Sequence, residues 1–114
     1  MTNSILRTTK KLLNVDPDDK NFEDQILTHI NAALGTLTSM GVGPAEGLYV
    51  TDDSAEWTDF VTDPKMVGIL QEYVCVRCRP IFDAPSTSFV ADSLKKREDE
   101  LAFWLQDEAT YGGG

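Results

Sequence analysis

The segment from Asp63 to Pro80 constrains the fold of this 114-residue chain more than any other segment. Asp63 before Pro64 is a typical helix start, because an aspartate can cap the free N–H groups and a proline suits the first helical turn. The residues that follow, KMVGILQEYVCVRCR, are apolar on most sides of a helix rather than along one stripe. Such a helix is stable only when other elements surround it. We therefore expect a central, buried helix over about 64–79, which Pro80 ends or kinks.

Two amphipathic helices are expected before this central helix. The first spans about 3–14, with apolar residues at helical spacing and with Thr2 or Asn3 as its cap. A proline-containing break follows it. The second spans about 22–40, with Asn21 as its cap, and it ends at a glycine-rich stop. Each of them has an apolar face that can cover one side of the central helix.

A fourth helix is expected after a second proline-containing break. It starts at Ser86 or Ser88 and runs to about Glu108. Residues 109–114 end in three glycines and are expected to form a flexible tail. The prediction is therefore a single all-α domain over residues 1–108, a four-helix bundle. The apolar residues assigned to the inner face of the fourth helix are Val90, Leu94, Leu101, Trp104 and Leu105.

The connection between the second and third helices, residues 42–62, is long and acidic and contains no basic residue. Leu48–Val50 is a candidate short strand, and Ser54–Phe60 is a candidate helical turn. Long loops in small domains often carry function or contact partners. Trp57 and Phe60 therefore have two interpretations: they are exposed anchors for a partner, or they fold back onto the core as a lid.

The charge of the chain argues against a nucleic-acid-binding protein. Nineteen acidic residues oppose ten basic ones, which gives a net charge of −9. Binding to phosphate groups needs clustered lysine and arginine. The longest basic run, Lys95–Arg97, is flanked by acids, so we interpret it as part of a solvated helix face of mixed charge.

Cys75 and Cys78 have the C-x-x-C spacing that occurs in redox centres and in zinc sites. A structural zinc site needs four ligands, but the chain has no second cysteine pair and only one histidine, His29. A redox cysteine usually lies at a helix N-terminus, where the helix dipole lowers its pKa. Here the pair lies late in the third helix. We therefore expect both thiols to pack in the core, with a redox role as the alternative.

The other chemical motifs are incomplete. The stretch DPDDKNFED lacks the glycine and the final glutamate of a calcium-binding EF-hand loop, and GVGPAEG lacks the lysine of a phosphate-binding loop. No stretch is long and apolar enough to predict a membrane span or a signal peptide. The sequence therefore predicts no catalytic, cofactor or metal site, and it favours a reduced, intracellular protein made in the cytoplasm.

Three stretches carry a resemblance to a known family: HINAALGTLTSMGVGP at a helix end, the acidic turn EWTDF, and the junction FDAPSTSFVADSL. Their order resembles that of the head–tail connector proteins of long-tailed bacteriophages, which are also called adaptor or head-completion proteins. The resemblance covers about Leu6 to Leu105. Pro80 departs from it, because a residue compatible with a helix is expected there.

The resemblance implies a structural protein of the virion neck, between capsid and tail, that catalyses no reaction. It implies a ring of roughly twelve copies joined head to tail. That ring would bind the portal protein, extend its DNA channel and dock a stopper or tail-completion protein. DNA would pass through without specific binding. The alternative from a different class is a small acidic helical interaction module, such as a regulator, with no role in the virion.

The same resemblance suggests roles for two sets of residues. A negatively charged channel wall repels the DNA backbone and lets it slide. The candidate channel-lining acids are Glu46, Asp52, Asp53, Glu56 and Asp59. Aromatic side chains often anchor interfaces. The candidate interface residues are Tyr49, Trp57, Phe60 and Tyr111, and the tail after Leu105 is expected to contact the portal.

Overall fold

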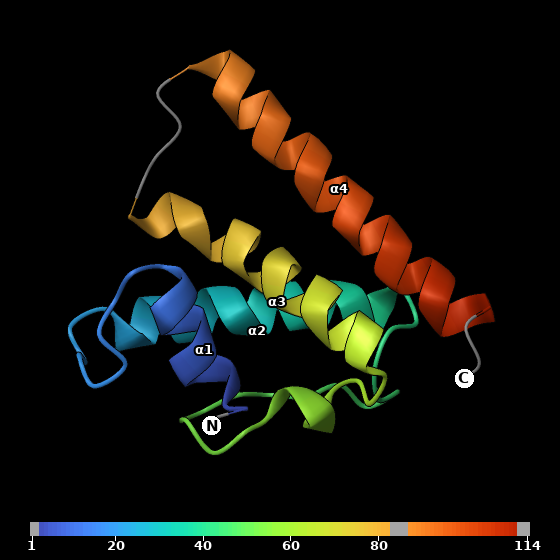
Figure 1. Ribbon diagram of the computed structural model, residues 1–114, viewed down its shortest axis with the longest axis horizontal. Coiled ribbons are helices and arrows are strands. Elements are labelled where there is room, and N and C mark those ends of the chain that lie inside the picture. The colour runs from blue at the N-terminus through green and yellow to red at the C-terminus, as the bar shows by residue number, and fades with distance from the viewer. Residues whose placement is uncertain (1–2, 83–86, 112–114) are drawn as a thin grey trace.

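The computed structural model describes residues 3–82 and 87–111, which form four α-helices and two short 3₁₀ helices (Figure 1). No strand occurs in these two ranges, so the predicted all-α class is confirmed. The elements in chain order are α1 (Ile5–Leu12), α2 (Glu23–Ser39), η1 (Trp57–Asp59), α3 (Pro64–Cys78), η2 (Arg79–Ile81) and α4 (Ser88–Tyr111).

Helix α3 is the centre of the molecule, as its sequence predicts. It contacts α1, α2 and α4, and it lies between α4 and the long loop in Figure 1. Leu70, Tyr73 and Val74 are almost completely buried. The Asp63 carboxylate accepts a hydrogen bond from the Lys65 N–H, which is the expected cap. The α-helix ends at Cys78 and continues as η2, because Pro80 has no N–H to extend it.

The ends of the other helices differ from the prediction. Ser4 caps α1 by accepting the Arg7 N–H at 3.2 Å, in place of the expected Thr2 or Asn3. No side chain caps α2, so the prediction for Asn21 was wrong. Helix α4 continues to Tyr111 rather than ending near Glu108, so part of the expected tail is helical. The rest of that tail, residues 112–114, lies outside the described residues.

A buried lysine fixes the connection between α1 and α2, although its ammonium group only donates hydrogen bonds and so does not cap the free N–H groups of α2. The Lys10 side chain is only 2% exposed. Its ammonium group donates to the Glu23 carboxylate and the Asp19 carbonyl, both at 2.8 Å, and to the Pro17 carbonyl at 3.3 Å. These bonds hold α1, the 13–22 connection and the first turn of α2 together. The connection is thus fixed by one ammonium group instead of a local cap.

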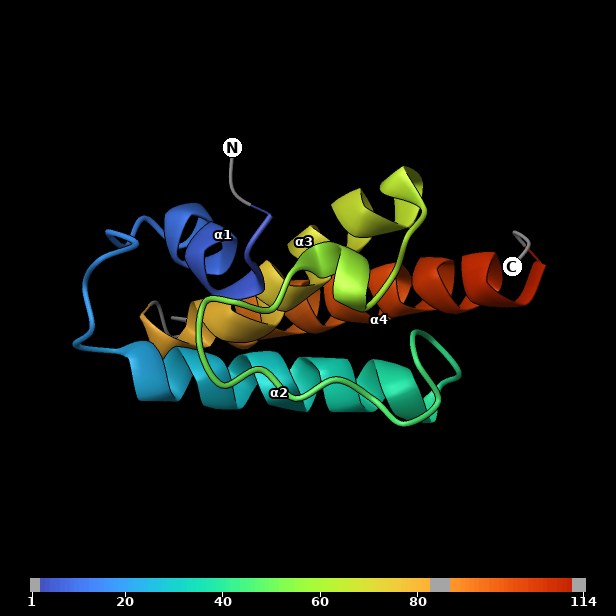
Figure 2. The same ribbon diagram turned by 90° about the horizontal axis from the view of Figure 1, so that it is seen from below.

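The predicted strand at Leu48–Val50 was wrong, for a specific reason. The segment is extended, but its partner is a side chain rather than a strand: the Asn31 amide donates to the Val50 carbonyl at 2.9 Å and accepts the Val50 N–H at 2.7 Å. The only strand-like pairing between described residues is an isolated bridge of Ser4 with Glu56. Figure 2 shows this loop running along α2 before it rises to η1.

The helical turn predicted around Trp57 is confirmed as η1, and it closes the core. Trp57 is 1% exposed and Phe60 is 4% exposed. The Phe60 ring lies directly on the backbone of Gly43, where a Cβ atom would come within 2.7 Å of the ring. Gly43 also has φ +81°, which glycine adopts without strain. The long loop is therefore packed against the core along much of its length.

Candidate assembly surfaces

The structure buries two of the four aromatic residues that the sequence predicted at an interface. Trp57 and Phe60 belong to the hydrophobic core, so the interpretation as exposed anchors was wrong and the lid interpretation was right. Their burial follows from η1, which turns the apolar side of the loop inward. Tyr49 is 76% exposed and stays a candidate. Tyr111 is the last residue of α4, and its side chain lies outside the described residues.

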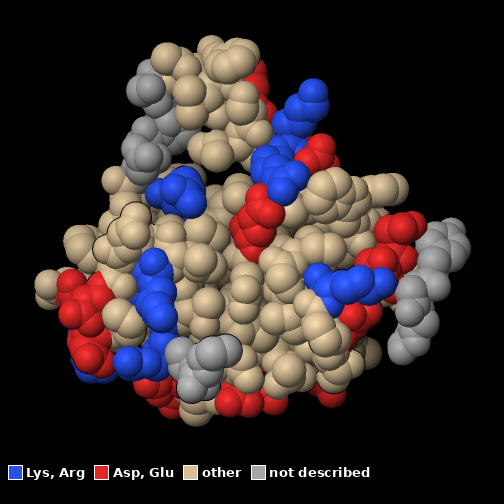
Figure 3. Space-filling view, in the orientation of Figure 1, with Lys and Arg blue, Asp and Glu red and all other residues tan. Residues whose placement is uncertain are grey.

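All five candidate channel acids are exposed: Glu46, Asp52, Asp53, Glu56 and Asp59. Acidic side chains gather along the lower edge of Figure 3, where Figure 1 places the loop. Four of the five also have a structural role nearby. Hydrogen bonds from the Ser54 hydroxyl and N–H lower the pKa of Asp52, Asp53 pairs with Arg7 at 3.7 Å, and Glu56 with Asp59 forms the capping box of η1.

Helix α4 carries the surface that the sequence prediction missed. Leu101, Ala102 and Leu105 bury one face near its C-terminal end. Phe103 lies two residues after Leu101, which is about 200° around the helix. Phe103 is 61% exposed and Phe89 is 78% exposed. With Lys96 between them at seven-residue intervals, they form what we call the outer stripe of α4: Phe89, Lys96 and Phe103.

The inner face of α4 is also less buried than its sequence predicts. Val90 is 39% exposed and Trp104 is 41% exposed. Trp104 is covered by a charged group instead of the core, since the Arg97 guanidinium lies 5.2 Å from the centre of its ring. The spacing of Phe89 and Phe103, which lie two heptads apart on one side of the helix, was the available signal for a second apolar stripe.

Ion pairs hold the first half of α4 against α3. Arg97 donates two hydrogen bonds to the Glu72 carboxylate, at 2.7 and 2.9 Å, and one to Glu100. The pKa of Arg97 is raised, mainly by its hydrogen bonds to Glu72. Arg77 reaches Glu98 at 3.4 Å, and hydrogen bonding to Glu98 raises the pKa of Lys95. Arg97 and Glu72 are partly exposed, so salt weakens their pair, whereas the Arg77 and Glu98 side chains are only 23% and 21% exposed and are screened less.

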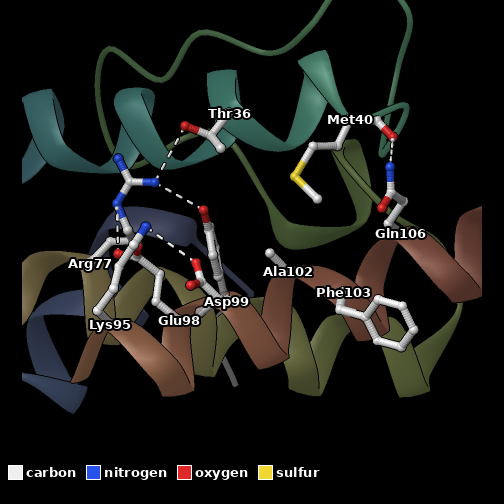
Figure 4. A pocket seen from close by; sticks show the side chains of 10 residues that line it. Thr36, Met40, Arg77, Lys95, Glu98, Asp99, Ala102, Phe103 and Gln106 are labelled. Carbon is white, nitrogen blue, oxygen red and sulfur yellow. Dashed lines mark hydrogen bonds and ion pairs between the residues drawn. The ribbon is translucent and has the colours of Figure 1, made fainter. Parts of the chain in front are cut away.

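An open groove of about 480 Å³ lies between α2 and α4, and Tyr73 and Arg77 of α3 also line it (Figure 4). Met40, Ala102 and Phe103 form one end, as Figure 4 shows. The other end is a group of charged residues that pair with one another: Arg77, Lys95, Glu98 and Asp99. The mutual pairing leaves this end close to neutral, so it favours packing between helices over the binding of a charged ligand.

The two cysteines pack as the sequence predicts. Cys78 is fully buried in the core, and Cys75 is buried beside Leu12. Burial raises the pKa of Cys78 to about 12, with a further increase from the neighbouring Cys75. A thiol with this pKa stays protonated near neutral pH, so it is a poor nucleophile for disulfide exchange.

No metal centre or membrane span was found in the part of the chain that the structure describes. No three His, Cys, Asp or Glu side chains there come together as ligands for an ion. None of the helices there is both long enough and apolar enough to cross a membrane. His29, the one histidine, is partly buried on α2.

The fold and its surfaces define a small all-α domain whose distinctive feature is an uncovered aromatic face on its last helix. The model of one family, described as phage connector protein, matches residues 5–112. The chain therefore belongs to the phage connector proteins, and it has a connector role as a component of the virion. No match was found among the curated proteins or among the solved structures.

Proposed function

We propose that this connector assembles into a head-to-tail ring beneath the portal, extends the DNA channel, docks a stopper or tail-completion protein, and catalyses no reaction. The observation that carries the proposal is the family match over residues 5–112, which covers every α-helix of the fold. By the resemblance, the ring has roughly twelve copies, and its head-to-tail symmetry needs two different surfaces on each subunit. The virion neck is its proposed place.

Two exposed surfaces support this assembly. One is the outer stripe of α4, with two phenylalanine side chains in solvent. The other is the long loop beside α2, with Tyr49 exposed. Figure 1 places α4 and this loop on opposite sides of α3. Aromatic residues are enriched at the centres of protein interfaces, so both surfaces suit protein partners.

The negative charge supports the proposed channel. The chain carries −9, and the five exposed acids of the loop concentrate part of that charge in one region. A wall of like charge repels the DNA backbone and keeps the passing genome unbound. Glu46 is the best residue for testing this role, because it is exposed and makes no hydrogen bond or ion pair within the described chain, so its replacement should leave the fold intact.

The end of α4 is the proposed contact with the portal. Residues 106–111 continue the helix beyond the last buried leucine, Leu105. Gln106 donates to the carbonyl of Met40, the residue that follows α2, at 3.2 Å. Deletion of 106–114 should therefore abolish portal binding while the helical circular dichroism signal falls only slightly. Unchanged portal binding would exclude this assignment.

The deciding experiment mixes the purified protein with the portal protein of the same phage and images the mixture by electron microscopy. The proposed function predicts a second ring stacked on the portal, in register with its channel. A protein that leaves portal rings bare at micromolar concentrations would contradict the function. A regulator without a role in the virion would give that negative result.

A further inference from the structure

The outer stripe of α4 has features that the fold of one subunit does not explain. Phe89 and Phe103 point away from the buried side of the helix, and they lie about 21 Å apart along its axis. Lys96 lies midway between them. Its neighbours Lys95 and Arg97 both pair with carboxylates, whereas Lys96 is exposed and has no carboxylate partner within the described residues.

A groove on the other side of the molecule has the matching properties. It lies between α2 and residues 49–51 and has a volume of about 450 Å³. An apolar cavity of about 150 Å³ can hold a benzene ring, so this space is sufficient for a phenylalanine side chain. Leu27, Thr28 and the exposed Tyr49 form its walls. Asp24 lies at its edge, exposed and without an ion-pair partner in the part of the chain described.

We infer that the outer stripe of α4 in one subunit packs into this α2 groove of the next subunit. A phenylalanine of the stripe enters the groove beside Tyr49, and Lys96 pairs with Asp24. The inference rests on the proposed ring and names the two surfaces that build it. The partner that fills the groove is a second copy of this chain. The stripe of one copy carries the positive charge of Lys96, and the groove of the next copy carries the negative charge of Asp24 and the aromatic side chain of Tyr49.

The positions of the two surfaces also suit a ring. They are different surfaces of one subunit, and Figure 1 shows α4 and the loop on opposite sides of α3. A contact between unlike surfaces leaves one of each free at the ends of a pair, so further copies can be added. A contact of α4 with α4 would instead stop at a dimer.

A charge exchange tests this contact. Lys96→Glu and Asp24→Lys each place two like charges opposite one another in the assembled ring, which strongly disfavours association. Each single variant should lower the fraction of portals that carry a ring by roughly tenfold or more. The double variant, Lys96→Glu with Asp24→Lys, restores opposite charges and should recover ring formation. Electron microscopy with the portal protein gives the counts.

Lys11→Glu is the matched control, since Lys11 is also exposed and has no ion-pair partner among the described residues. It should form rings as the unmodified protein does. A second variant, Phe89→Ser with Phe103→Ser, should lose the rings and keep the circular dichroism spectrum of the folded chain. Because these side chains are exposed, their loss leaves the core unchanged.

The outcomes separate this contact from the ring itself. If the unmodified protein forms rings and the single charge variants do so equally well, the contact is wrong and the proposed function stands. The contact is also wrong if the double variant stays as deficient as the single ones, or if the serine variant forms rings but no longer binds the portal. Absence of rings from the unmodified protein would overturn both proposals.

Discussion

Helices α2 and α4 flank the same central helix, yet they are attached to it in different ways. Helix α2 buries Ile26, Ile30, Ala33, Leu34 and Leu37 along its 17 residues. The buried residues of the longer α4, with 24 residues, are Leu101, Ala102 and Leu105, all in its second half. Its first half has no fully buried side chain among the described residues, and it contacts α3 through partly exposed ion pairs. Helix α2 therefore contributes more to the core of the fold, whereas the first half of α4 is the surface that we propose for partners.

The largest expected effect is on a core residue of α2. Leu34 is completely buried, so Leu34→Ala should lower the free energy of unfolding by about 2–5 kcal/mol. The matched change on α4, Phe89→Ala, should alter it by less than about 0.5 kcal/mol, because that side chain is exposed. Urea denaturation followed by circular dichroism measures both. Equal losses for the two variants would contradict the division between the helices.

The next largest effect is expected where the loop closes the core. Gly43→Ala adds a Cβ atom within 2.7 Å of the Phe60 ring, at a φ of +81° that alanine rarely adopts. Strain and overpacking together should cost about 1–3 kcal/mol in the free energy of unfolding. Gly41→Ala is the control, since it has a similar φ but open space around it, and it should cost less. The same denaturation experiment ranks them.

The ion pair of Lys10 on α1 with Glu23 on α2 should make the free energy of unfolding depend on pH. The Lys10 hydrogen bond is the main cause that lowers the pKa of Glu23 below its ordinary value of 4.5. A carboxyl with a depressed pKa in the folded state stabilises the fold above that ordinary value, and this contribution is lost as the pH falls through the folded pKa. Thermal melting between pH 7 and pH 3 should show this loss.

Glu23→Gln removes the titrating group from this pair. The variant should be less stable than the original protein at pH 7, and the difference between the two should shrink as the pH falls below about 4.5. A difference that stays constant from pH 7 to pH 3 would show that the pair contributes no pH dependence.

The smallest expected effect concerns the ion pairs of α4. Arg97→Gln removes the bonds to Glu72 and Glu100 and the cover over Trp104. Because these groups are exposed, global stability should change little. The amide protons of 88–100 should nevertheless exchange faster, since few buried contacts hold this segment. Hydrogen exchange read by mass spectrometry detects the change, and 0.5 M salt should produce part of it in the unmodified protein.

Most of the fold could be predicted from the sequence, because hydrophobic spacing and proline positions are local signals. The apolar run of α3 specified the central helix, and Pro80 marked its end. Asn31 could not be foreseen as the partner of Val50, since that contact joins residues 19 positions apart. The contact of Lys10 with Glu23 could not be foreseen for a similar reason, since it joins two helices across 13 positions of the sequence.

The candidate site was predicted less well. Trp57 and Phe60 have the composition of interface anchors, but the turn at η1 directs them into the core, and a sequence does not reveal which side of a loop faces inward. The outer stripe of α4 was hidden because α4 has apolar residues on two faces. The prediction assigned one inner face and left Phe89 and Phe103 unexplained.

The most direct test of the account compares hydrogen exchange in the free protein with exchange in the assembly on the portal. In the free protein, the amides of α2 should exchange slowly and those of 88–100 quickly. On the portal, 88–103 should gain protection, because a partner now covers the outer stripe. If rings form and the exchange of 88–103 does not change, the first half of α4 is not the surface that builds the assembly.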